Sequence, residues 1–384
     1  MKTIITSLIL AFACLNAFAQ TYHSQFGKGE LSFPSGIATD NQGNIYVAEQ
    51  GDHRVLKYNA SGVFQSQFGT GGDGNGQFTF PVDLAIDNAG YIYVVDQANA
   101  RVQIFNSSGI YQSQFGSGGS GDGQFDNPSG IDLDNSGNIY VVDQNNHRIQ
   151  KFNSAGVFQT KFGTNGTGDG NFSYPNDIVV DGSGNVYVTD QGNHRIQVFN
   201  SSGVYQSQFG SVGTSTGQFK SPNSLAFDSD ENIYVTDQNN RRVQVFTKSG
   251  AFIKEFGSYG SNDGEFLYLI GIAIDPSNNI YVSDAGNNRI QKFTNTITSI
   301  HKKFPDNTIS IYPNPTINIL TIDYTNNDVL SIVIYNSQSK LMKQLNYTKL
   351  DCQIDVSNLE CGAYYLVITD SSDRQMTQKL IVEK

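Results

Sequence analysis

The chain has 384 residues, of which 39 are Gly, 25 are Phe, 20 are Tyr and none is Trp, and 15% of the residues are charged. This Gly-rich, aromatic and weakly charged composition argues against a helical bundle, a coiled coil and a disordered chain, and it favours β structure. The formal net charge of −11 repels phosphate groups, so we expect neither nucleic acid nor an acidic membrane as a partner.

Residues 1–19 have the pattern of a secretory signal peptide. Lys2 precedes an apolar run at residues 4–12, and residues 17–19, Ala-Phe-Ala, are suited to cleavage. Cys14 raises the alternative of a lipoprotein, but the residue three positions before it is Ala rather than the Leu that a lipoprotein signal prefers. The apolar run is too short for a transmembrane helix and no later stretch is long enough, so we expect an exported chain without a transmembrane span.

A unit of 47 residues recurs six times along the chain. Each unit contains four predicted strands separated by turns rich in Asn, Ser and Gly, and in the third unit the strands are residues 130–134, 138–143, 148–152 and 157–162. Four antiparallel strands in a unit of this length are typical of a β-propeller blade. The spacing falls to 42 once, between Phe26 and Phe68, which indicates a five-residue deletion in one loop.

The two ends of the array predict how the ring closes. The first three strand types occur six times each, and the last of them, residues 289–293, is not followed by a fourth. Residues 22–27 instead nearly copy the fourth-strand sequence at residues 111–116. We therefore expect the amino-terminal strand to pair with residues 289–293 and to complete a sixth blade.

The repeated residues resemble NHL repeats. In the third unit the matching segments are Pro128 to Ile131, Gly137 to Asp143 and Asn146 to Phe152, and the units depart from the pattern only locally, as where Leu269 replaces Pro. The resemblance covers residues 22–293. It implies an all-β fold in which residues 20–293 form a six-bladed propeller.

Residues that recur in every unit are predicted to serve the scaffold, because one asymmetric site cannot need six copies of a residue. An acidic residue and an Arg five positions later predict ion pairs within or between blades. The pairs are Glu49 and Arg54, Asp96 and Arg101, Asp143 and Arg148, Asp190 and Arg195, Asp237 and Arg242, and Asp284 and Arg289.

Two further patterns suggest binding chemistry but are better explained as scaffold. His53, His147 and His194 share one repeat position, yet zinc needs three nitrogens at about 2.0 to 2.1 Å, and loops of different blades are spread around a ring. The Gly-rich connections, such as residues 71–76 and 166–171, lack both the closing Glu of an EF-hand and the Lys-Ser/Thr of a P-loop. We expect them to be flexible connections on one face of the propeller.

Three aspartates near the innermost strands break the repeat. Asp83 and Asp177 stand where other units have Gly or Ser, and Asp132 stands where others have Ala or Val. Carboxylates from consecutive blades could bind calcium or another divalent cation in the central channel. The alternative, which we favour, is that Asp83 and Asp177 accept hydrogen bonds from nearby turn amides, so that no cofactor is required.

After residue 293 the repeat stops. Residues 294–310 are a predicted linker, and residues 311–384 are predicted to form a small Ig-like β-sandwich with strands at residues 320–322, 332–335, 364–368 and 379–382. Cys352 and Cys361 lie inside this segment and are candidates for a disulfide in an oxidising compartment.

This carboxyl-terminal segment resembles the type A sorting domain of the type IX secretion system of Bacteroidetes. The matching residues are Tyr312 to Pro315, Ile332 to Asn336, Ile354 to Ser357, Gly362 to Leu366 and Lys379 to Lys384. The resemblance implies that the type IX secretion machinery handles the chain through residues 311–384 and that the chain is secreted or held at the outer-membrane surface.

Two classes of function follow. The first is an extracellular module that binds or scaffolds a glycan, a peptide or a protein. The second is a metal-dependent extracellular lyase or hydrolase with its site in the propeller channel. Near-perfect repetition and few unmatched polar residues favour the first class, and we identify no catalytic residue.

Overall fold

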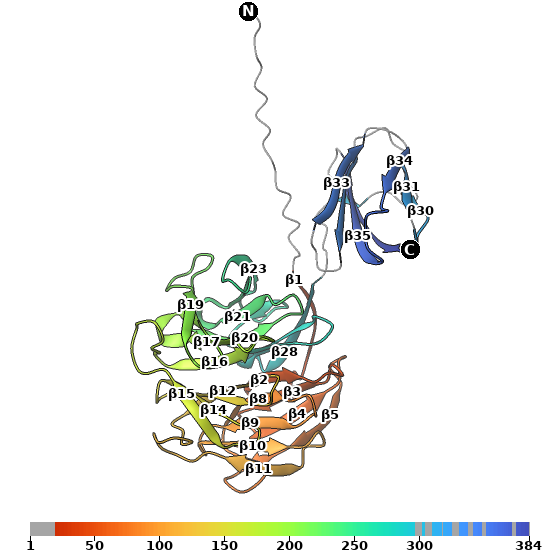
Figure 1. The fold of residues 1–384 in the computed structure, drawn as a ribbon. Coiled ribbons are helices and arrows are strands. Elements are labelled where there is room, and N and C mark those ends of the chain that lie inside the picture. Colours follow the sequence, from red (N-terminus) through yellow and green to blue (C-terminus); the bar gives the residue numbers. More distant parts are fainter. Residues whose placement is uncertain are drawn as a thin grey trace, which may run out of the picture. The chain divides into compact units, whose positions relative to one another are not determined.

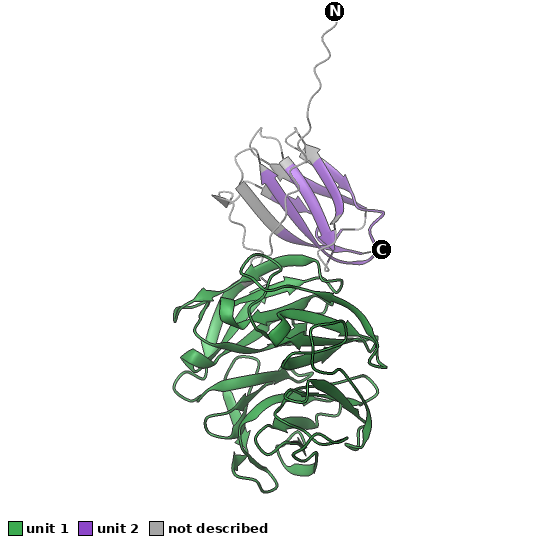
Figure 2. Ribbon diagram, turned by 90° about the vertical axis from the view of Figure 1, so that its left-hand side faces the viewer, with its two compact units in different colours: residues 1–296 green, residues 297–384 purple. Residues whose placement is uncertain are grey.

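The computed structural model describes residues 20–295, 302–303, 309–316, 318–324, 330–336, 341–347, 351–370 and 374–383. The predicted signal peptide, residues 1–19, lies outside the described residues. The chain divides into two compact units, residues 1–296 and 297–384, which Figure 2 shows in different colours.

The first unit contains six four-stranded antiparallel sheets, here called blades 1 to 6. Blades 1 to 3 are β2 (Pro34–Thr39), β3 (Ile45–Glu49), β4 (Arg54–Tyr58) and β5 (Phe64–Phe68); β8 (Pro81–Ile86), β9 (Ile92–Asp96), β10 (Arg101–Phe105) and β11 (Tyr111–Phe115); and β12 (Pro128–Leu133), β13 (Ile139–Asp143), β14 (Arg148–Phe152) and β15 (Phe158–Phe162). Blades 4 to 6 are β16 (Pro175–Val180), β17 (Val186–Asp190), β18 (Arg195–Phe199) and β19 (Tyr205–Phe209); β20 (Pro222–Phe227), β21 (Ile233–Asp237), β22 (Arg242–Phe246) and β23 (Phe252–Phe256); and β26 (Leu269–Ile274), β27 (Ile280–Asp284), β28 (Arg289–Asn295) and β1 (Gln20–Phe26).

The blades close into a ring around their first strands. The inner strands β2, β8, β12, β16, β20 and β26 contact one another in this order, and β26 contacts β2 again. Figure 1 shows the labelled inner strands of blades 1 to 5 near the middle of the unit and the outer strands β5, β11, β15, β19 and β23 at its edge. The six-bladed all-β propeller is therefore confirmed.

The amino-terminal strand completes blade 6 as predicted. β1 pairs antiparallel with β28, so that Phe26 lies opposite Ile290 and Tyr22 lies opposite Phe293. The rings of Phe26 and Tyr58 lie 4.8 Å apart, which ties this strand to blade 1 as well. The first and last strands of the propeller thus meet in one sheet.

The apolar cores lie between neighbouring blades. Each second strand is buried along its whole length, as in β13 (Ile139–Asp143), because its two faces contact different blades. Phe125 is fully buried in one such core and packs against Gly116, which has φ of 95°. A Cβ atom at Gly116 would come within 2.5 Å of the Phe125 ring, so only glycine fits there.

The predicted ion pairs form within each blade, and they also anchor the Gly-rich connections. In blade 2 the Arg101 Nε lies 2.8 Å from Asp96 Oδ2, and Arg101 Nη2 donates to the carbonyls of Gly74 and Gln77 at 2.8 and 2.9 Å. Asp96 Oδ1 accepts a hydrogen bond from Thr79 N at 2.7 Å. The expectation of flexible connections gains no support from these bonds, because buried charged groups hold the middle and the second half of the connection.

Short parallel pairs and single turns complete the first unit. The connections into blades 2 and 6 each fold back on themselves, in β6 (Thr70–Gly71) with β7 (Gln77–Phe78) and in β24 (Ser258–Tyr259) with β25 (Glu265–Phe266). Three 3-10 turns follow the second strands of blades 4 to 6, at Gln191–Asn193, Gln238–Asn240 and Ala285–Asn287. No helix among the described residues has the length and apolar character needed to cross a membrane.

The second unit consists of two sheets around one core. The five-stranded sheet has the order β29, β36, β35, β32, β33, and the three-stranded sheet has the order β30, β31, β34. Leu320 and Ile354 from the smaller sheet pack with Ile332 and Leu366 from the larger one. The strands are β29 (Lys302–Lys303), β30 (Ile309–Tyr312), β31 (Ile319–Tyr324), β32 (Leu330–Asn336), β33 (Leu341–Tyr347), β34 (Asp351–Asp355), β35 (Gly362–Asp370) and β36 (Arg374–Val382).

The structure gives no support to the predicted disulfide. Cys361 is exposed and free. Cys352 lies in β34 of the three-stranded sheet, and its side chain is outside the described residues, whereas Cys361 stands just before β35 of the five-stranded sheet.

Candidate functional site

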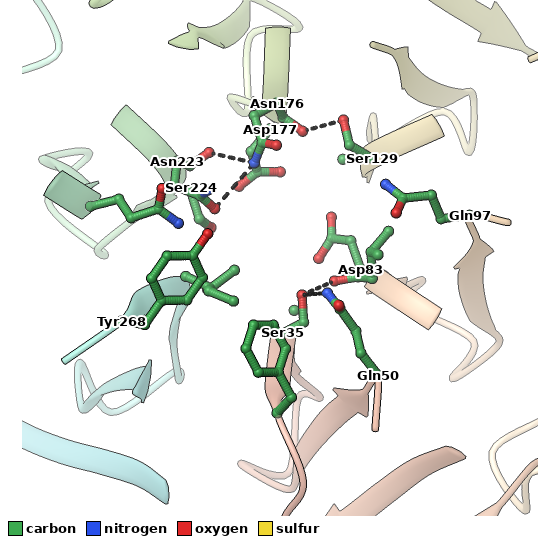
Figure 3. Close-up of a pocket in the computed structure, with 17 residues that line it drawn as sticks. Ser35, Gln50, Asp83, Gln97, Ser129, Asn176, Asp177, Asn223, Ser224 and Tyr268 are labelled. Atoms are coloured by element: carbon green, nitrogen blue, oxygen red, sulfur yellow. Dashed lines mark hydrogen bonds between the residues drawn. The ribbon is translucent and has the colours of Figure 1, made fainter. Parts of the chain in front are cut away.

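A pocket lies on the propeller axis where the inner strands begin, and we call it the axial pocket. Its cavity volume is about 180 Å³. The lining residues come from all six blades, and Figure 3 shows their side chains arranged around an open centre. The polar lining side chains are the amides of Gln50, Gln97, Asn176, Asn223 and Gln238, the hydroxyls of Ser35, Ser129, Ser224 and Tyr268, and the carboxylates of Asp83 and Asp177.

Hydrogen bonds between blades hold the walls of the axial pocket in place. The Ser35 hydroxyl donates to the Val82 carbonyl at 2.7 Å, and the Ser129 hydroxyl donates to the Asn176 carbonyl at 2.6 Å. Asn176 Nδ2 donates to Asn223 Oδ1 at 3.1 Å. Because each bond links one blade to the next, the pocket is organised before any ligand arrives.

Asp83 and Asp177 also connect neighbouring blades. Asp83 Oδ2 accepts from the Ile131 amide of blade 3 at 2.9 Å, and Asp177 Oδ2 accepts from the Leu225 amide of blade 5 at 3.0 Å. Both carboxylates therefore bind backbone amides, as favoured from the sequence. The amides belong to the next inner strand rather than to a turn.

Asp132 makes the same type of bond but does not line the axial pocket. It lies two residues beyond Gly130 on β12, and its Oδ2 accepts from the Val180 amide of blade 4 at 2.7 Å. The structure thus brings Asp83 and Asp177 to one pocket and places Asp132 further along the channel. Within the part of the chain that the structure describes, no three Asp, Glu, His or Cys side chains are grouped so as to hold a metal ion.

Burial away from water shifts the pKa values of these aspartates. Burial raises the pKa of Asp132 to about 7 and that of Asp177 to about 6. Burial, together with the negative charge of Asp177, raises the pKa of Asp83 well above its usual range. The pocket carboxyls are therefore easier to protonate near neutral pH than exposed ones.

Aromatic side chains directly precede four of the inner strands, and two of them, Phe33 and Tyr268, line the mouth of the axial pocket. The sequence reasoning missed them. They occupy the position just before the inner strand in four blades and are 37% to 52% exposed: Phe33, Phe80, Tyr174 and Tyr268. Blades 3 and 5 have Asn127 and Ser221 there. The available signal was a position that varies between units directly before a Pro that recurs in five of them.

The three histidines of the repeat position support this mouth and do not converge on one point. His53 Nδ1 accepts from the Phe80 amide at 3.2 Å, His147 Nδ1 from the Tyr174 amide at 3.1 Å, and His194 Nδ1 from the Ser221 amide at 3.1 Å. Each histidine thus binds the connection of the following blade, which agrees with the scaffold role favoured from the sequence.

Together, the ring of six four-stranded sheets and its axial pocket define the first unit as a six-bladed β-propeller. Comparison with known families specifies both units. The family described as NHL repeat matches residues 31–58, 78–105, 125–152 and 172–199, and the family described as 6-bladed beta-propeller matches residues 227–321. The family described as secretion system C-terminal sorting domain matches residues 310–383. The chain therefore carries NHL repeats in a six-bladed propeller and a C-terminal sorting domain.

Solved structures support the fold of the propeller. An auxiliary nutrient binding protein from Bacteroides thetaiotaomicron is 15% identical with a TM-score of 0.54, covering 68% of this chain and 69% of its own. A streptogramin B lyase is 14% identical with a TM-score of 0.52, and the match covers 72% of this chain and 99% of the lyase. A gluconolactonase from Xanthomonas campestris is 13% identical with a TM-score of 0.52, and the match covers 69% of this chain and 86% of the gluconolactonase. At such identities the similarity concerns the fold alone. No curated protein matches the chain.

The sorting domain implies export and handling by the type IX secretion machinery. The expected location is therefore confirmed as secreted or at the cell surface.

Proposed function

We propose that this exported protein is a binding module and that its propeller takes a polar ligand in the axial pocket. The observation that carries the proposal is the character of the pocket lining. Many residues of the blades recur from unit to unit and serve packing, whereas the second and third positions of the inner strands, which line the pocket, differ from blade to blade and include Ser, Asn and Asp. A concave site with converging polar groups is the usual form of a ligand site.

The charges of the lining restrict the ligand. Asp83 and Asp177 are the charged side chains in the lining, which contains neither Lys nor Arg nor His. An anion would find no positive counter-charge in this lining, so the favoured ligands are uncharged or cationic molecules with several hydrogen-bond donors. Hydroxyl-rich and amine-bearing compounds meet this requirement.

The hydrogen bonds of the lining favour binding over catalysis. One oxygen of each pocket carboxylate is already engaged by a backbone amide of the next blade. The lining contains no Cys, Lys or His to act as a nucleophile or base beside these groups. The alternative of a metal-dependent lyase or hydrolase gains no support from the grouping of acidic and histidine side chains.

A thermal-shift screen tests this proposal. The purified chain without its signal peptide is heated with monosaccharides and oligosaccharides, amino acids, dipeptides and dicarboxylates. A ligand present at 100 times its Kd stabilises the fold by about 2.7 kcal/mol, which for a domain of this size raises Tm by about 5–10 °C. We expect such a rise with at least one uncharged or cationic compound and none with the dicarboxylates.

The variant Gln97→Leu locates the effect in the axial pocket. Leu fills a similar volume but loses the amide, so the ligand-induced rise in Tm should vanish while the fold persists. The matched control is Gln112→Leu, which alters an exposed amide on the outer strand β11. If no compound raises Tm, or if Gln97→Leu leaves the rise intact, the pocket is not the ligand site.

A further inference from the structure

We infer that the mouth of the axial pocket extends into a platform for a neutral glycan chain, formed by Tyr268, Phe33 and Phe80. We call these three residues the aromatic arc. They belong to blades 6, 1 and 2, which are consecutive around the ring. The inference rests on the proposed function, since it names the class of ligand that the pocket takes.

The arc is continuous with the axial pocket. Phe33 and Tyr268 both line the pocket, and their ring centroids lie 5.8 Å apart with 36° between the planes. Phe80 does not line the pocket and occupies the same position before the next inner strand, β8. Its ring packs on His53 with the centroids 5.2 Å apart, so this ring is held in place as well.

The backbone conformation at two residues of the arc, Phe33 and Phe80, is unfavourable for a bulky side chain. Phe33 and Phe80 both have φ of 55°, in the left-handed region that bulky side chains rarely adopt. The equivalent residue of blade 3 is Asn127, a residue type that tolerates this conformation well, at φ of 56°. Phe33 and Phe80 thus occupy a conformation that Asn would adopt more readily, and Phe33 in addition lines the axial pocket, which supports a binding role.

The connection into blade 1, directly before Phe33 at the centre of the arc, is the shortest connection between blades. The connection that enters blade 1 runs from Gly27 to Leu31, whereas the equivalent connection into blade 2 runs from Gly69 to Phe78 and contains the β6–β7 pair. The missing five residues remove that folded-back segment directly before Phe33. A chain that leaves the axial pocket over blade 1 therefore passes the shortest connection of the ring.

A glycan matches this combination better than other polymers do. A sugar ring offers an apolar C–H face to an aromatic ring and hydroxyl groups at its edge to carboxyl and amide oxygens. The pocket supplies such acceptors in Asp83, Gln97 and Asn223, and its volume of about 180 Å³ is that of about six waters, roughly the space of one monosaccharide. Acidic polysaccharides are disfavoured by the two pocket carboxylates and by the chain's net charge of −11.

Affinity electrophoresis of the full exported chain in gels containing soluble polysaccharides tests the inference. The probes are laminarin, xyloglucan, galactomannan and dextran as neutral chains, and polygalacturonate and alginate as acidic ones. We expect retardation by at least one neutral polysaccharide and by neither acidic one. Phe33→Asn should weaken the retardation about tenfold or more, as expected of a central aromatic contact, and Phe80→Asn several-fold.

The Tm values of the same variants show whether a loss of binding reflects a loss of folding. Because Asn suits the left-handed conformation, Phe33→Asn and Phe80→Asn should keep or raise Tm while they lose binding. The matched variant Tyr174→Asn changes the same position in blade 4, outside the arc, at φ of 48°. It should bind the polysaccharide as the unaltered chain does.

The possible failures separate the inference from the proposed function. Retardation by none of the neutral polysaccharides, or equal loss in Tyr174→Asn and Phe33→Asn, overturns the aromatic arc as a glycan platform. If dipeptides or other small molecules still raise Tm through Gln97, the axial pocket remains a ligand site and only the glycan assignment fails. Retardation by the acidic polysaccharides alone also overturns it.

Discussion

Among single residues, the aspartates of the inner strands make the stability of the propeller depend on pH. Each of these carboxylates accepts a hydrogen bond from a backbone amide of the following blade, as seen at Asp83, Asp132 and Asp177. They therefore link three successive pairs of blades. Burial nevertheless opposes their ionised form, and it raises their pKa values. A folded chain with raised carboxyl pKa values binds more protons than the unfolded chain between about pH 4 and pH 7.

The stability of the propeller should therefore fall as pH rises through this range. The contribution of Asp132 is fully present below its unfolded pKa near 4 and is lost as pH passes its folded pKa of about 7. In Asp132→Asn the side-chain amide oxygen can still accept the hydrogen bond from Val180 N, but the side chain no longer ionises. We expect denaturation curves to show a smaller loss of stability between pH 5 and pH 8 in this variant than in the unaltered chain.

An exposed aspartate serves as the control for that comparison. Asp122 forms a surface pair with Lys161, so Asp122→Asn should leave the pH dependence between pH 5 and pH 8 unchanged. Parallel stability profiles of Asp132→Asn and the unaltered chain would contradict the role given to Asp132.

At the residue scale, part of the site was predictable from the sequence. Asp83 and Asp177 were singled out because they break the repeat, and both line the axial pocket. Phe33 was not, because an aromatic residue in an aromatic-rich repeat looks like core until its exposure is known. Whether a side chain faces the axis, the solvent or a neighbouring blade depends on strand twist and on the left-handed residue before the strand, and the repeat pattern does not encode these directly.

Within each blade, a buried ion pair also holds the connection into the blade. In blade 3 the Arg148 Nε lies 2.7 Å from Asp143 Oδ2, and Arg148 Nη2 donates to the carbonyls of Gly121 and Gln124 at 2.7 and 3.0 Å. Asp143 Oδ1 accepts from the Asp126 amide at 2.8 Å. One ion pair therefore supports the second and third strands and the loop before the first.

Removing the arginine should release this loop. In Arg148→Met the buried carboxylate of Asp143 loses its counter-charge, which costs about 3–5 kcal/mol of the free energy of unfolding. We expect a lower denaturation midpoint together with new cleavage by proteinase K between residues 117 and 125. Lys161→Met removes an exposed ion pair of the same blade, at 46% and 54% side-chain exposure, and should cost about 1 kcal/mol or less without new cleavage. Equal effects of the two variants would show that the buried pair does not anchor the loop.

The elements themselves were largely predictable because the repeat restates each strand six times. In blade 3 the predicted strands at residues 148–152 and 157–162 correspond to β14 (Arg148–Phe152) and β15 (Phe158–Phe162). The anchoring of the Gly-rich connections was not predictable, since it depends on contacts between residues 24 to 27 positions apart. In the second unit, which has no repeat, four strands were predicted and β29, β30, β33 and β34 were missed.

At the scale of the whole molecule, the propeller has a repeated framework, and its residues differ between blades on the face where the inner strands begin. β1 closes the ring by pairing with β28, and the sixfold ion pairs give every blade the same framework. The differences between blades collect where the inner strands begin, in the axial pocket and the aromatic arc. The sorting domain accounts for export, and we propose the propeller as the unit that binds the ligand.

Hydrogen exchange with and without the polysaccharide that retards the chain most strongly is the most direct test that this face is the binding site. Amide protection reports which backbone segments a ligand covers or stiffens. We expect added protection at residues 33–36, 80–83 and 268–271, at the mouth of the axial pocket, and no change at the turns before β5, β11 and β15 at the other end of the blades. Protection confined to those turns, or none at the pocket mouth, would contradict the assignment of the ligand site to the propeller axis.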